Sequence, residues 1–226
     1  MNNRLVILGG GESGVGTALL AKKEGWQVFL SDFGKIAETH KQVLIHHEID
    51  WEEGKHSQEK IFAADVVMKS PGIPDTVAMI VELRAKGISV ISEIEFAEAY
   101  TNATIVGITG SNGKTTTAAL THFILKAGEM NVGLGGNIGK SFAALVSEED
   151  YENYVLELSS FQLDGIEKFA PHIAVLTNLS PDHLDRYDYQ YDKYIASKFR
   201  ITKNQTEDDF FICLLYTSDA ADEEDS

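Results

Sequence analysis

Short apolar runs alternate along this chain with longer segments of helical periodicity. The runs predict buried strands at Arg4–Leu8, Val28–Ser31, Val43–His46, Asp65–Lys69, Ser89–Ile91, Tyr154–Ser160 and Ile173–Leu176, and in a β-branched run from Thr104. Helical spacing occurs at Gly14–Glu24, Asp75–Lys86, Glu93–Tyr100, Lys114–Gly128 and Tyr187–Lys203. Short strands joined by crossover helices are typical of parallel sheets, so the fold class that we predict is α/β.

The chain has 226 residues, which is enough for two domains of ordinary size. We expect a Rossmann-like parallel-sheet domain in residues 1–92 and an incomplete P-loop ATPase-type α/β domain in residues 93–212. The acidic helical segment Glu93–Tyr100 would link them. No apolar run approaches the roughly 20 residues that span a bilayer, so we expect no membrane insertion.

The stretch Thr109–Thr116 joins a predicted strand to a predicted helix and contains a glycine-rich turn. Such a junction presents backbone N–H groups and the positive end of a helix dipole to a polyphosphate. The predicted contacts are Gly110, Ser111, Asn112, Gly113, Lys114, Thr115 and Thr116. In a P-loop the lysine reaches the β- and γ-phosphates and the next hydroxyl ligates Mg²⁺. Ile108 replaces the usual first glycine, and a chance lysine in an ordinary turn is the alternative.

A second glycine-rich loop, Gly9–Gly14, satisfies G-x-G-x-x-G between the first strand and the first helix. It predicts a nucleotide pyrophosphate at the helix N-terminus, with Ser13 as an additional donor. Asp32 follows the second strand at about the distance of a ribose-binding acid. The pattern does not distinguish NAD from another nucleotide, and Asp32 as a plain turn-forming acid is the alternative.

Two further loops carry candidate binding residues. Ser70-Pro-Gly-Ile-Pro74 follows a strand, and ligands of open α/β sheets collect at the carboxyl ends of strands. We therefore expect this loop, with Ser70 and Gly72, to face the same crevice as Gly9–Gly14, although a tight proline-glycine turn explains it equally well. In the glycine-rich segment Gly133–Gly139, Asn137 is the residue best able to contact a ligand, or else it only serves the turn.

Three side chains in the second half of the chain are candidate metal or phosphate contacts. Glu157 lies in an apolar strand, where an unpaired carboxylate is costly; a metal ion or a structural salt bridge would satisfy it. His183 follows a strand among acids, although such a histidine is often an exposed loop residue. Lys198 shares a helical stripe with Tyr191 and Tyr194, so it either points into the site or extends to solvent.

The amino-acid composition limits the classes of partner and the cellular compartment that we expect. The formal charge is −16, which argues against a nucleic-acid partner, and the eight acids of residues 207–226 account for half of it. A single cysteine, Cys213, rules out an internal disulfide framework and fits a reducing cytoplasm. The N-terminus lacks the pattern of a signal peptide, so we expect a cytoplasmic protein and, in addition, a monomer.

The motifs together resemble those of the Mur ligases of peptidoglycan synthesis. The resemblance rests on Thr109–Thr116, Gly135–Gly139, Leu156–Gln162 and Asn178–Tyr187, in this order and spacing, and covers about residues 1–212. Leu158-Ser-Ser-Phe161 and the dinucleotide-type N-terminal fold favour the members that add D-glutamate. Members that add the third amino acid typically carry Val-Ser-Ser-His and lack that fold.

The resemblance implies roles for the candidate residues. UDP would contact Ser13, Asp32, the Ser70–Gly72 loop and Asn137, and ATP would bind at Gly110–Thr116. One Mg²⁺ would lie near Thr115 and Glu157, and a second near His183 and Lys198, with Lys198 carbamylated. Catalytic roles fall on Lys114, Glu157, His183 and Lys198. The implied reaction is ATP-dependent formation of an amide between UDP-N-acetylmuramoyl-L-alanine and D-glutamate through an acyl phosphate.

The end of the chain departs from the family, whose members continue into a third domain. Residues 213–226 form an acidic tail without family resemblance, and we expect it to be non-native or disordered. A truncated chain of this kind would not complete catalysis and would leave an exposed edge in its second sheet. Two alternatives remain: a non-catalytic nucleotide-binding fragment, and an NAD-dependent oxidoreductase based on Gly9–Gly14 and Asp32.

Overall fold

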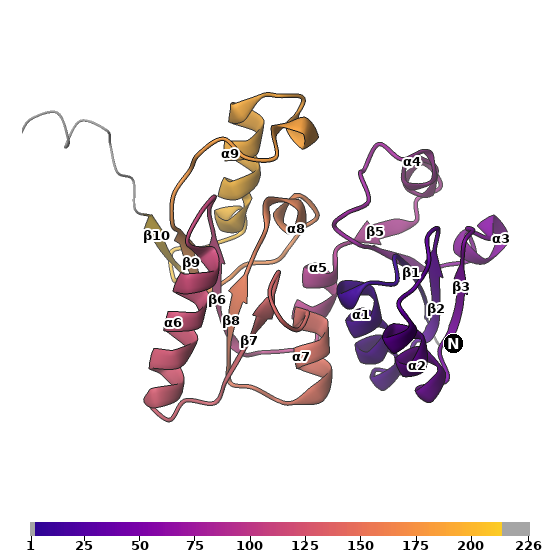
Figure 1. The fold of residues 1–226 in the computed structure, drawn as a ribbon, viewed down its shortest axis with the longest axis horizontal. Helices are drawn as coiled ribbons and strands as arrows, with labels where there is room; N and C mark the ends of the chain where they lie inside the picture. The colour runs from indigo at the N-terminus through magenta and orange to yellow at the C-terminus, as the bar shows by residue number, and fades with distance from the viewer. Residues whose placement is uncertain (1–2, 214–226) are drawn as a thin grey trace, which may run out of the picture.

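The computed structural model describes residues 3–213, which fold around two separate parallel sheets (Figure 1). The first sheet has the order β3-β2-β1-β4-β5. Its strands are β1 (Arg4–Leu8), β2 (Gln27–Asp32), β3 (Asp50–Glu53), β4 (Val66–Lys69) and β5 (Ser89–Ile91). Its helices are α1 (Glu12–Lys23), α2 (Glu38–His46), α3 (Gln58–Ile61) and α4 (Ala78–Ala85). Strand order reverses at β1, as expected for a doubly wound fold that binds ligands at the carboxyl ends of its strands.

The second sheet has the order β10-β9-β6-β8-β7 and is also parallel throughout the described pairs. Its strands are β6 (Thr104–Thr109), β7 (Val132–Gly136), β8 (Asn153–Glu157), β9 (Ile173–Leu176) and β10 (Phe210–Cys213). Its helices are α5 (Glu93–Glu98), α6 (Lys114–Ala127), α7 (Phe142–Glu148), α8 (Ser160–Asp164) and α9 (Tyr191–Phe199), with short 3₁₀ turns at Leu184–Tyr187 and Arg200–Thr202. Both α/β units therefore match the predicted fold class.

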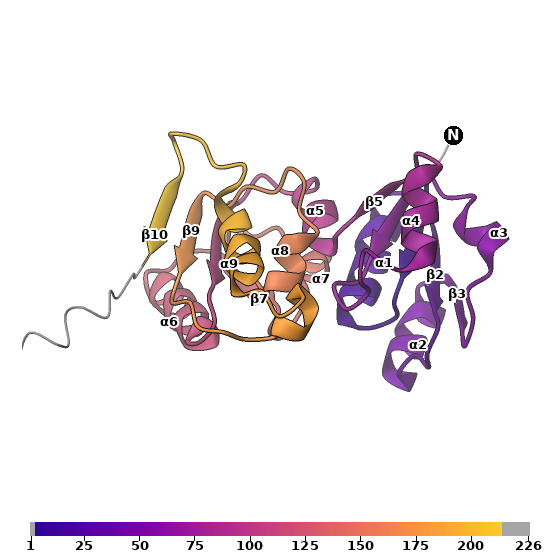
Figure 2. The ribbon, with the colours of Figure 1, turned by 90° about the horizontal axis from the view of Figure 1, so that it is seen from above.

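Alternating side chains of β1 pack into two different apolar clusters. Leu5 and Ile7 face the cluster that contains α1, whereas Val6 and Leu8 face the opposite cluster with α3 and α4. The first cluster continues through α5 and α7 to Tyr154 and Leu156 of the second sheet. One core therefore connects the two sheets, and Figure 2 shows the two halves joined along the α1, α5 and α7 side.

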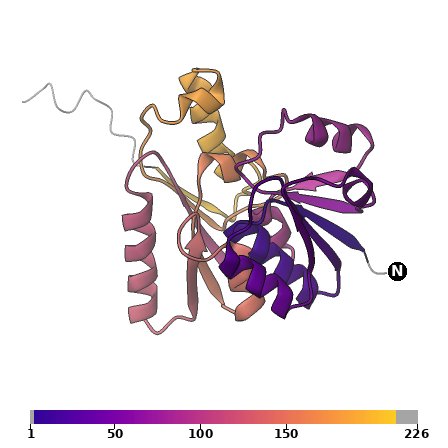
Figure 3. The same cartoon turned by 45° about the vertical axis from the view of Figure 1, so that its right-hand side comes forward.

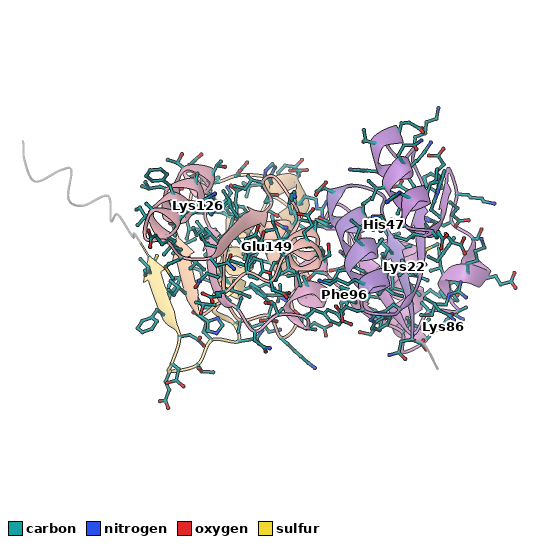
Figure 4. All side chains as sticks on the ribbon, turned by 90° about the horizontal axis from the view of Figure 1, so that it is seen from below. Lys22, His47, Lys86, Phe96, Lys126 and Glu149 are labelled. Carbon is teal, nitrogen blue, oxygen red and sulfur yellow. The ribbon has the colours of Figure 1, made fainter. Side chains whose placement is uncertain are left out.

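The junction between the two halves is tightly packed. Helices α1 and α7 lie against each other, and a Cβ placed on Gly16 of α1 would come within 2.1 Å of Ser141 Oγ. Trp26 Nε1 donates a 2.7 Å hydrogen bond to the Tyr100 hydroxyl, and its ring meets Phe96 edge-on. Phe96 is labelled at this junction in Figure 4, and Figure 3 shows the helices of the first half against the α7 side of the second half.

A buried acid holds the linking helix α5 against α7. Glu93 is 2% exposed, and its Oε1 accepts a hydrogen bond from the backbone N–H of Ala143 in the first turn of α7. Its Oε2 has no hydrogen-bond partner among the described residues. Burial, reinforced by the charge of Glu12, raises the pKa of Glu93 to about 7.

Three predicted elements are wrong. Val43–His46 is not a strand but the end of α2; only Leu44 is buried there, and Ile45 is 58% exposed. A short apolar run does not distinguish a helix from a strand. The actual third strand, β3, is the charged segment Asp50–Glu53 at a sheet edge, where a strand needs few apolar residues.

The other two corrections concern the second half. Gly133–Gly136 is part of strand β7 instead of a loop, since it pairs with β8 over its whole length. The predicted helix Tyr187–Lys203 is interrupted, because Asp188 and Tyr189 have φ angles of +53° and +57°, and α9 begins only at Tyr191. The left-handed conformation cannot continue a helix.

Strand β10 forms the edge of the second sheet among residues 3–213, as expected. Phe210, Phe211 and Ile212 are 66%, 42% and 52% exposed. Of the predicted tail 213–226, all but Cys213 lies outside the described residues. None of the helices described is both long and apolar enough to cross a bilayer.

Candidate functional site

The loop Gly110–Gly113 connects the carboxyl end of β6 to the first residue of α6, as predicted. Gly110 and Gly113 have φ angles of +140° and +78°, which residues with a side chain rarely adopt. A Cβ on Gly110 would also come within 2.1 Å of Thr177 Oγ1. The first turn of α6 leaves backbone N–H groups without helical acceptors at an exposed surface around Thr115 and Thr116. This geometry suits an anionic ligand.

Lys114 lies back over this loop. Its Nζ donates hydrogen bonds of 2.9 Å to the carbonyl oxygens of Gly110 and Ser111. The lysine therefore places a positive charge directly above the turn where the helix N-terminus is also positive. Both positive features favour the binding of an anion at this loop.

Ser111 and Asn112, both predicted to contact ATP, mainly fasten the loop to the segment after β9. Ser111 Oγ is buried, donates to the Ser180 carbonyl at 2.8 Å and lies 2.9 Å from the Tyr194 hydroxyl. The backbone N–H of Asn112 donates to Asn178 Oδ1 at 3.0 Å. The Ser111 hydroxyl and the Asn112 backbone, together with the Asn112 side chain that donates to Ser180 Oγ at 3.2 Å, hold the shape of the loop, which the sequence alone did not indicate.

The carboxylate of Glu157 at the end of β8 reaches the same junction. Its Oε2 accepts a 2.7 Å hydrogen bond from Thr115 Oγ1, and its Oε1 accepts a 2.8 Å bond from Asn137 Nδ2. Asn137, predicted to contact the UDP substrate, thus lies at the P-loop junction. The backbone N–H of Asn137 also donates to the Glu157 carbonyl at 2.8 Å.

The surroundings of Glu157 suit the role of a metal ligand. Its side chain is 2% exposed, yet within residues 3–213 no lysine, arginine or histidine nitrogen pairs with it. A buried carboxylate normally requires a cationic partner. The hydroxyl and carboxylate oxygens of Thr115 and Glu157 are the donor types that Mg²⁺ prefers.

Lys198 points inward from α9, as the helical stripe predicted. It is 2% exposed, and its Nζ donates to Thr109 Oγ1 at 3.3 Å, directly behind the P-loop. Burial and the nearby charge of Lys114 lower the pKa of Lys198 to about 8, although Asp182, Asp164 and Glu157 act in the opposite direction. The amine is therefore far less basic than an exposed lysine.

His183 lies farther out. Its side chain is 58% exposed, its Nε2 is 3.6 Å from Asp182 Oδ2, and its ring lies 5.3 Å from the Phe161 ring. Among the residues that the structure describes, no three His, Cys, Asp or Glu side chains converge as a metal cluster. The structure brings together Lys114, Thr115 and Glu157, with Lys198 behind the loop. A role for His183 as a second metal ligand stays a prediction.

The first sheet carries a separate candidate site at its carboxyl edge. Asp32 accepts the backbone N–H of Gly10 at 2.6 Å and that of Gly34 at 2.7 Å, so its carboxylate fastens the Gly9–Gly14 loop. Ser13 is in the first turn of α1 beside this loop. A cavity of about 500 Å³ is lined by Gly9, Asp32 and Gly72. The expectation that the two loops face one crevice is therefore confirmed.

Arg186 connects the two halves, a contact that the sequence did not indicate. Its guanidinium donates to the carbonyl oxygens of Pro71 and Gly72 at 3.3 and 3.2 Å and stacks over the Phe161 ring at 4.5 Å. A second cavity of about 520 Å³ lies beside this bridge and is lined from both halves, by Lys69 and Pro74 on one side and Phe161 on the other. This cavity therefore lies between the Ser70–Pro74 loop of the first half and the segments around Phe161 and Arg186 of the second.

Comparison with known proteins supports this architecture. Residues 108–223 match the family model described as Mur ligase middle domain, and residues 4–79 match that of the MurD N-terminal domain. The chain is 65% identical over 212 residues to the UDP-N-acetylmuramoylalanine--D-glutamate ligase of Christiangramia forsetii, covering 94% of this chain and 48% of that protein. It is 56% identical over 209 residues to the enzyme of the same name from Bacteroides thetaiotaomicron, covering 92% and 47%.

Two solved structures share the fold at low sequence identity. The UDP-N-acetylmuramate:L-alanyl-gamma-D-glutamyl-meso-diaminopimelate ligase from Neisseria meningitides has a TM-score of 0.69 at 20% identity, covering 98% of this chain and 74% of that one. The UDP-N-acetylmuramate-alanine ligase of Thermotoga maritima has a TM-score of 0.61 at 22% identity, covering 93% and 49%. The chain spans about half the length of the curated relatives it matches.

Proposed function

Because this chain belongs to the Mur ligase family, we propose that it provides the two nucleotide sites of an ATP-dependent ligase. The proposed reaction joins D-glutamate to UDP-N-acetylmuramoyl-L-alanine in peptidoglycan synthesis. The names of the relatives at 65% and 56% identity support this substrate pair. The observation that carries the proposal is the convergence of Lys114, Thr115 and Glu157 at a loop-to-helix junction, with a second such junction on the other sheet.

We assign ATP to the junction of β6 and α6. Lys114 would exchange its two loop carbonyl partners for phosphate oxygens, and the first-turn N–H groups would bind the same anion. Thr115 and Glu157 would hold Mg²⁺, which neutralises phosphate charge during phosphoryl transfer. Asn137 would keep the Glu157 carboxylate oriented through its 2.8 Å hydrogen bond.

We assign the uridine diphosphate of the other substrate to the junction of β1 and α1. Ser13 and the Gly9–Gly14 loop would bind the pyrophosphate, and Asp32, Ser70 and Gly72 would surround the nucleoside. The muramoyl-L-alanine part would then extend through the cavity beside Phe161 and Arg186 toward the P-loop. On this proposal the terminal carboxylate would reach the γ-phosphate of ATP.

The proposed chemistry has two balanced steps. A carboxylate oxygen attacks the γ-phosphorus of ATP, and an acyl phosphate and ADP result. The amine of D-glutamate then attacks the acyl carbon, phosphate leaves, and the nitrogen loses a proton as the amide forms. Positioning of two anions and neutralisation of charge are what the site must supply.

We also propose that Lys198 is carbamylated, with His183 near the resulting anion. The addition joins the neutral amine to CO₂ and releases one proton. Burial of Lys198 at 2% exposure behind Thr109 supports this, because a buried ammonium without a carboxylate in contact is costly. Cytoplasmic location and a monomeric state belong to the same proposal.

Competition binding tests the assignment of the first site. Binding of UDP-N-acetylmuramoyl-L-alanine to the 226-residue chain is measured by calorimetry, and NADH binding by fluorescence. We expect the UDP compound to bind and NADH not to displace it. Displacement of the UDP compound by NADH would instead favour the dinucleotide oxidoreductase, which assigns no role to the P-loop or Glu157. Amide formation, assayed with the same chain, separates the ligase from a nucleotide-binding fragment.

A further inference from the structure

Tyr194 is a buried tyrosine of α9 to which the proposed function assigns no role. Its side chain is 1% exposed, and its hydroxyl lies 2.9 Å from Ser111 Oγ in the P-loop. Helix α9 packs beside α8, as Figure 2 shows, and Lys198 follows Tyr194 one helical turn later. The helix that carries Lys198 therefore reaches the P-loop through a tyrosine hydroxyl.

The other partners of Ser111 determine the direction of this hydrogen bond. The backbone N–H of Ser180 can only donate, and it donates to Ser111 Oγ at 2.9 Å. The Ser180 carbonyl can only accept, so the one hydroxyl hydrogen of Ser111 points to it, at 2.8 Å. Tyr194 must then donate to the remaining lone pair of Ser111. Burial raises the pKa of Tyr194 above its usual value, so the phenol keeps the hydrogen that this bond requires.

A second contact joins α9 to the residue before Gly110. Thr109 Oγ1 donates to the Leu158 carbonyl at 2.7 Å, so it accepts the 3.3 Å hydrogen bond from Lys198 Nζ. Tyr194 and Lys198 thus contact the two residues that flank Gly110, whose φ angle is +140°. A shift of the loop at Gly110 therefore changes a contact with α9.

The assignment of ATP to the P-loop makes the Tyr194 contact more important. Lys114 Nζ also holds the loop, because it donates to the carbonyl oxygens of Gly110 and Ser111 at 2.9 Å each. Both of these bonds are lost when Lys114 exchanges the carbonyls for phosphate oxygens. The loop then depends on Tyr194 and on the segment after β9, where the Asn178 carbonyl accepts the Ser111 backbone N–H at 3.0 Å.

We propose that Tyr194 is a positioning residue that couples binding of the triphosphate at the P-loop to the position of Lys198. This proposal deepens the proposed function and rests on the assignment of ATP to the junction of β6 and α6. Phosphate that orders the loop also orders Ser111, Tyr194 and the face of α9 that carries Lys198. Coupling of this kind is reciprocal, so a correctly placed α9 strengthens the binding of ATP.

The alternative is that Tyr194 only fills the core. Its ring packs against those of Tyr187 and Tyr191, at 5.6 and 6.2 Å between ring centres. Tyr194→Phe separates the two roles, because it keeps the ring and removes only the hydroxyl that reaches Ser111. The matched control is Tyr191→Phe, which makes the same chemical change in a half-buried tyrosine three positions earlier on α9.

Binding calorimetry on the 226-residue chain measures the effect on the P-loop. We expect Tyr194→Phe to weaken Mg-ATP binding roughly threefold to tenfold, since the loop loses one hydrogen bond, and to leave the affinity for UDP-N-acetylmuramoyl-L-alanine unchanged. Tyr191→Phe should match the wild-type chain with both ligands.

Three results of this calorimetry would count against the proposal. Equal Mg-ATP affinity in Tyr194→Phe and the wild-type chain would overturn the role of Tyr194 while leaving the ATP site intact. An equal loss for both ligands would give Tyr194 a structural role only. Absence of Mg-ATP binding to the wild-type chain would overturn the assignment of ATP, on which the proposal rests.

A double-mutant cycle tests whether Tyr194 acts through Ser111. In a Ser111→Ala background the tyrosine hydroxyl has lost its partner on the loop. Adding Tyr194→Phe should then change the Mg-ATP affinity by less than about twofold. Additive losses would mean that the two hydroxyls act independently, which contradicts the proposal.

Hydrogen exchange followed by mass spectrometry gives a readout that does not depend on affinity. At saturating Mg-ATP we expect slower amide exchange at Gly110–Thr116 and in α9, both in the wild-type chain and in Tyr191→Phe. In Tyr194→Phe the slowing should persist at the loop and disappear from α9. Equal slowing of α9 in Tyr194→Phe and the wild-type chain, or no slowing of α9 in either, would overturn the coupling.

Discussion

The Thr115 hydroxyl donates a 2.7 Å hydrogen bond to the Glu157 carboxylate, although the two residues are 42 positions apart in the sequence. Thr115 lies in the first turn of α6, and Glu157 is the last residue of β8. Parallel strands β6 and β8 end at the same edge, so a hydroxyl and an acid meet beside a helix N-terminus. This pairing supports the proposed Mg²⁺ site.

Glu157→Gln should weaken the effect of Mg²⁺ on ATP binding. The amide keeps hydrogen-bonding groups for Thr115 and Asn137 but removes the charge that attracts the cation. We expect Mg²⁺ to strengthen ATP binding in the wild-type chain, and the gain to fall by about tenfold or more in the variant. Titrations of ATP in the presence of Mg²⁺ and in the presence of EDTA measure this gain in affinity. Glu152→Gln, an exposed change next to β8, is the control. An unchanged Mg²⁺ effect would reject this assignment.

Gly16→Ala tests the packing between α1 and α7. Alanine in a helix normally stabilises by about 1 kcal/mol relative to glycine. At Gly16, however, the added Cβ would lie 2.1 Å from Ser141 Oγ and 3.0 Å from the Ala144 nitrogen. Ser141 cannot move freely, because its hydroxyl caps α7. Overpacking costs about 1–3 kcal/mol, so we expect a net loss of stability.

Urea denaturation measures this change, and Ala119→Gly on the exposed surface of α6 calibrates the helix preference in the same chain. The contrary result is that Gly16→Ala raises the free energy of unfolding by as much as Ala119→Gly lowers it. That result would show that α1 and α7 are not in close contact.

Glu93→Gln should change stability in a pH-dependent way. The pKa of Glu93 is raised from 4.5 to about 7 by burial and by Glu12. The contribution of Glu93 to the free energy of unfolding is therefore highest below pH 4.5, where the acid is protonated in both the folded and the unfolded chain. This contribution falls as the pH rises from 4.5 toward 7 and stays constant at higher pH. Neutral glutamine avoids this loss, so the variant should gain on the order of 1–3 kcal/mol over the wild-type chain between pH 5 and pH 8.

Denaturant midpoints of both proteins at pH 5 and pH 8 give this difference. Glu59→Gln, an exposed change on α3, is the background for the same chemical substitution. A difference between Glu93→Gln and the wild-type chain that does not vary with pH would mean that Glu93 ionises as freely in the folded state as in the unfolded one.

Much of the fold could be predicted from local signals. Strands β1, β5 and β9 begin and end where the apolar runs do, and α6 begins at Lys114 after its glycine turn. The edge strand β3 was missed because its register with β2, and not its own hydrophobicity, places it in the sheet. Periodicity also ignores left-handed residues such as Asp188, which divide the last helical segment.

The candidate site was predicted in part. The P-loop lysine and hydroxyl lie together with Glu157, and Lys198 points inward as its helical stripe indicated. The contacts of Arg186 gave no sequence signal. Its partners, Pro71 and Gly72, are far away in the chain, and the packing of the two halves brings them together.

The central claim is that two nucleotides bind at two separate loop-to-helix junctions. The most direct test is calorimetry of UDP-N-acetylmuramoyl-L-alanine and of Mg-ATP, each alone and each with the other present, on the wild-type chain and on Lys114→Ala. We predict one site for each ligand, no competition between them, and loss of Mg-ATP binding alone in the variant. Competition between the two ligands, or undiminished Mg-ATP binding by Lys114→Ala, would contradict the account.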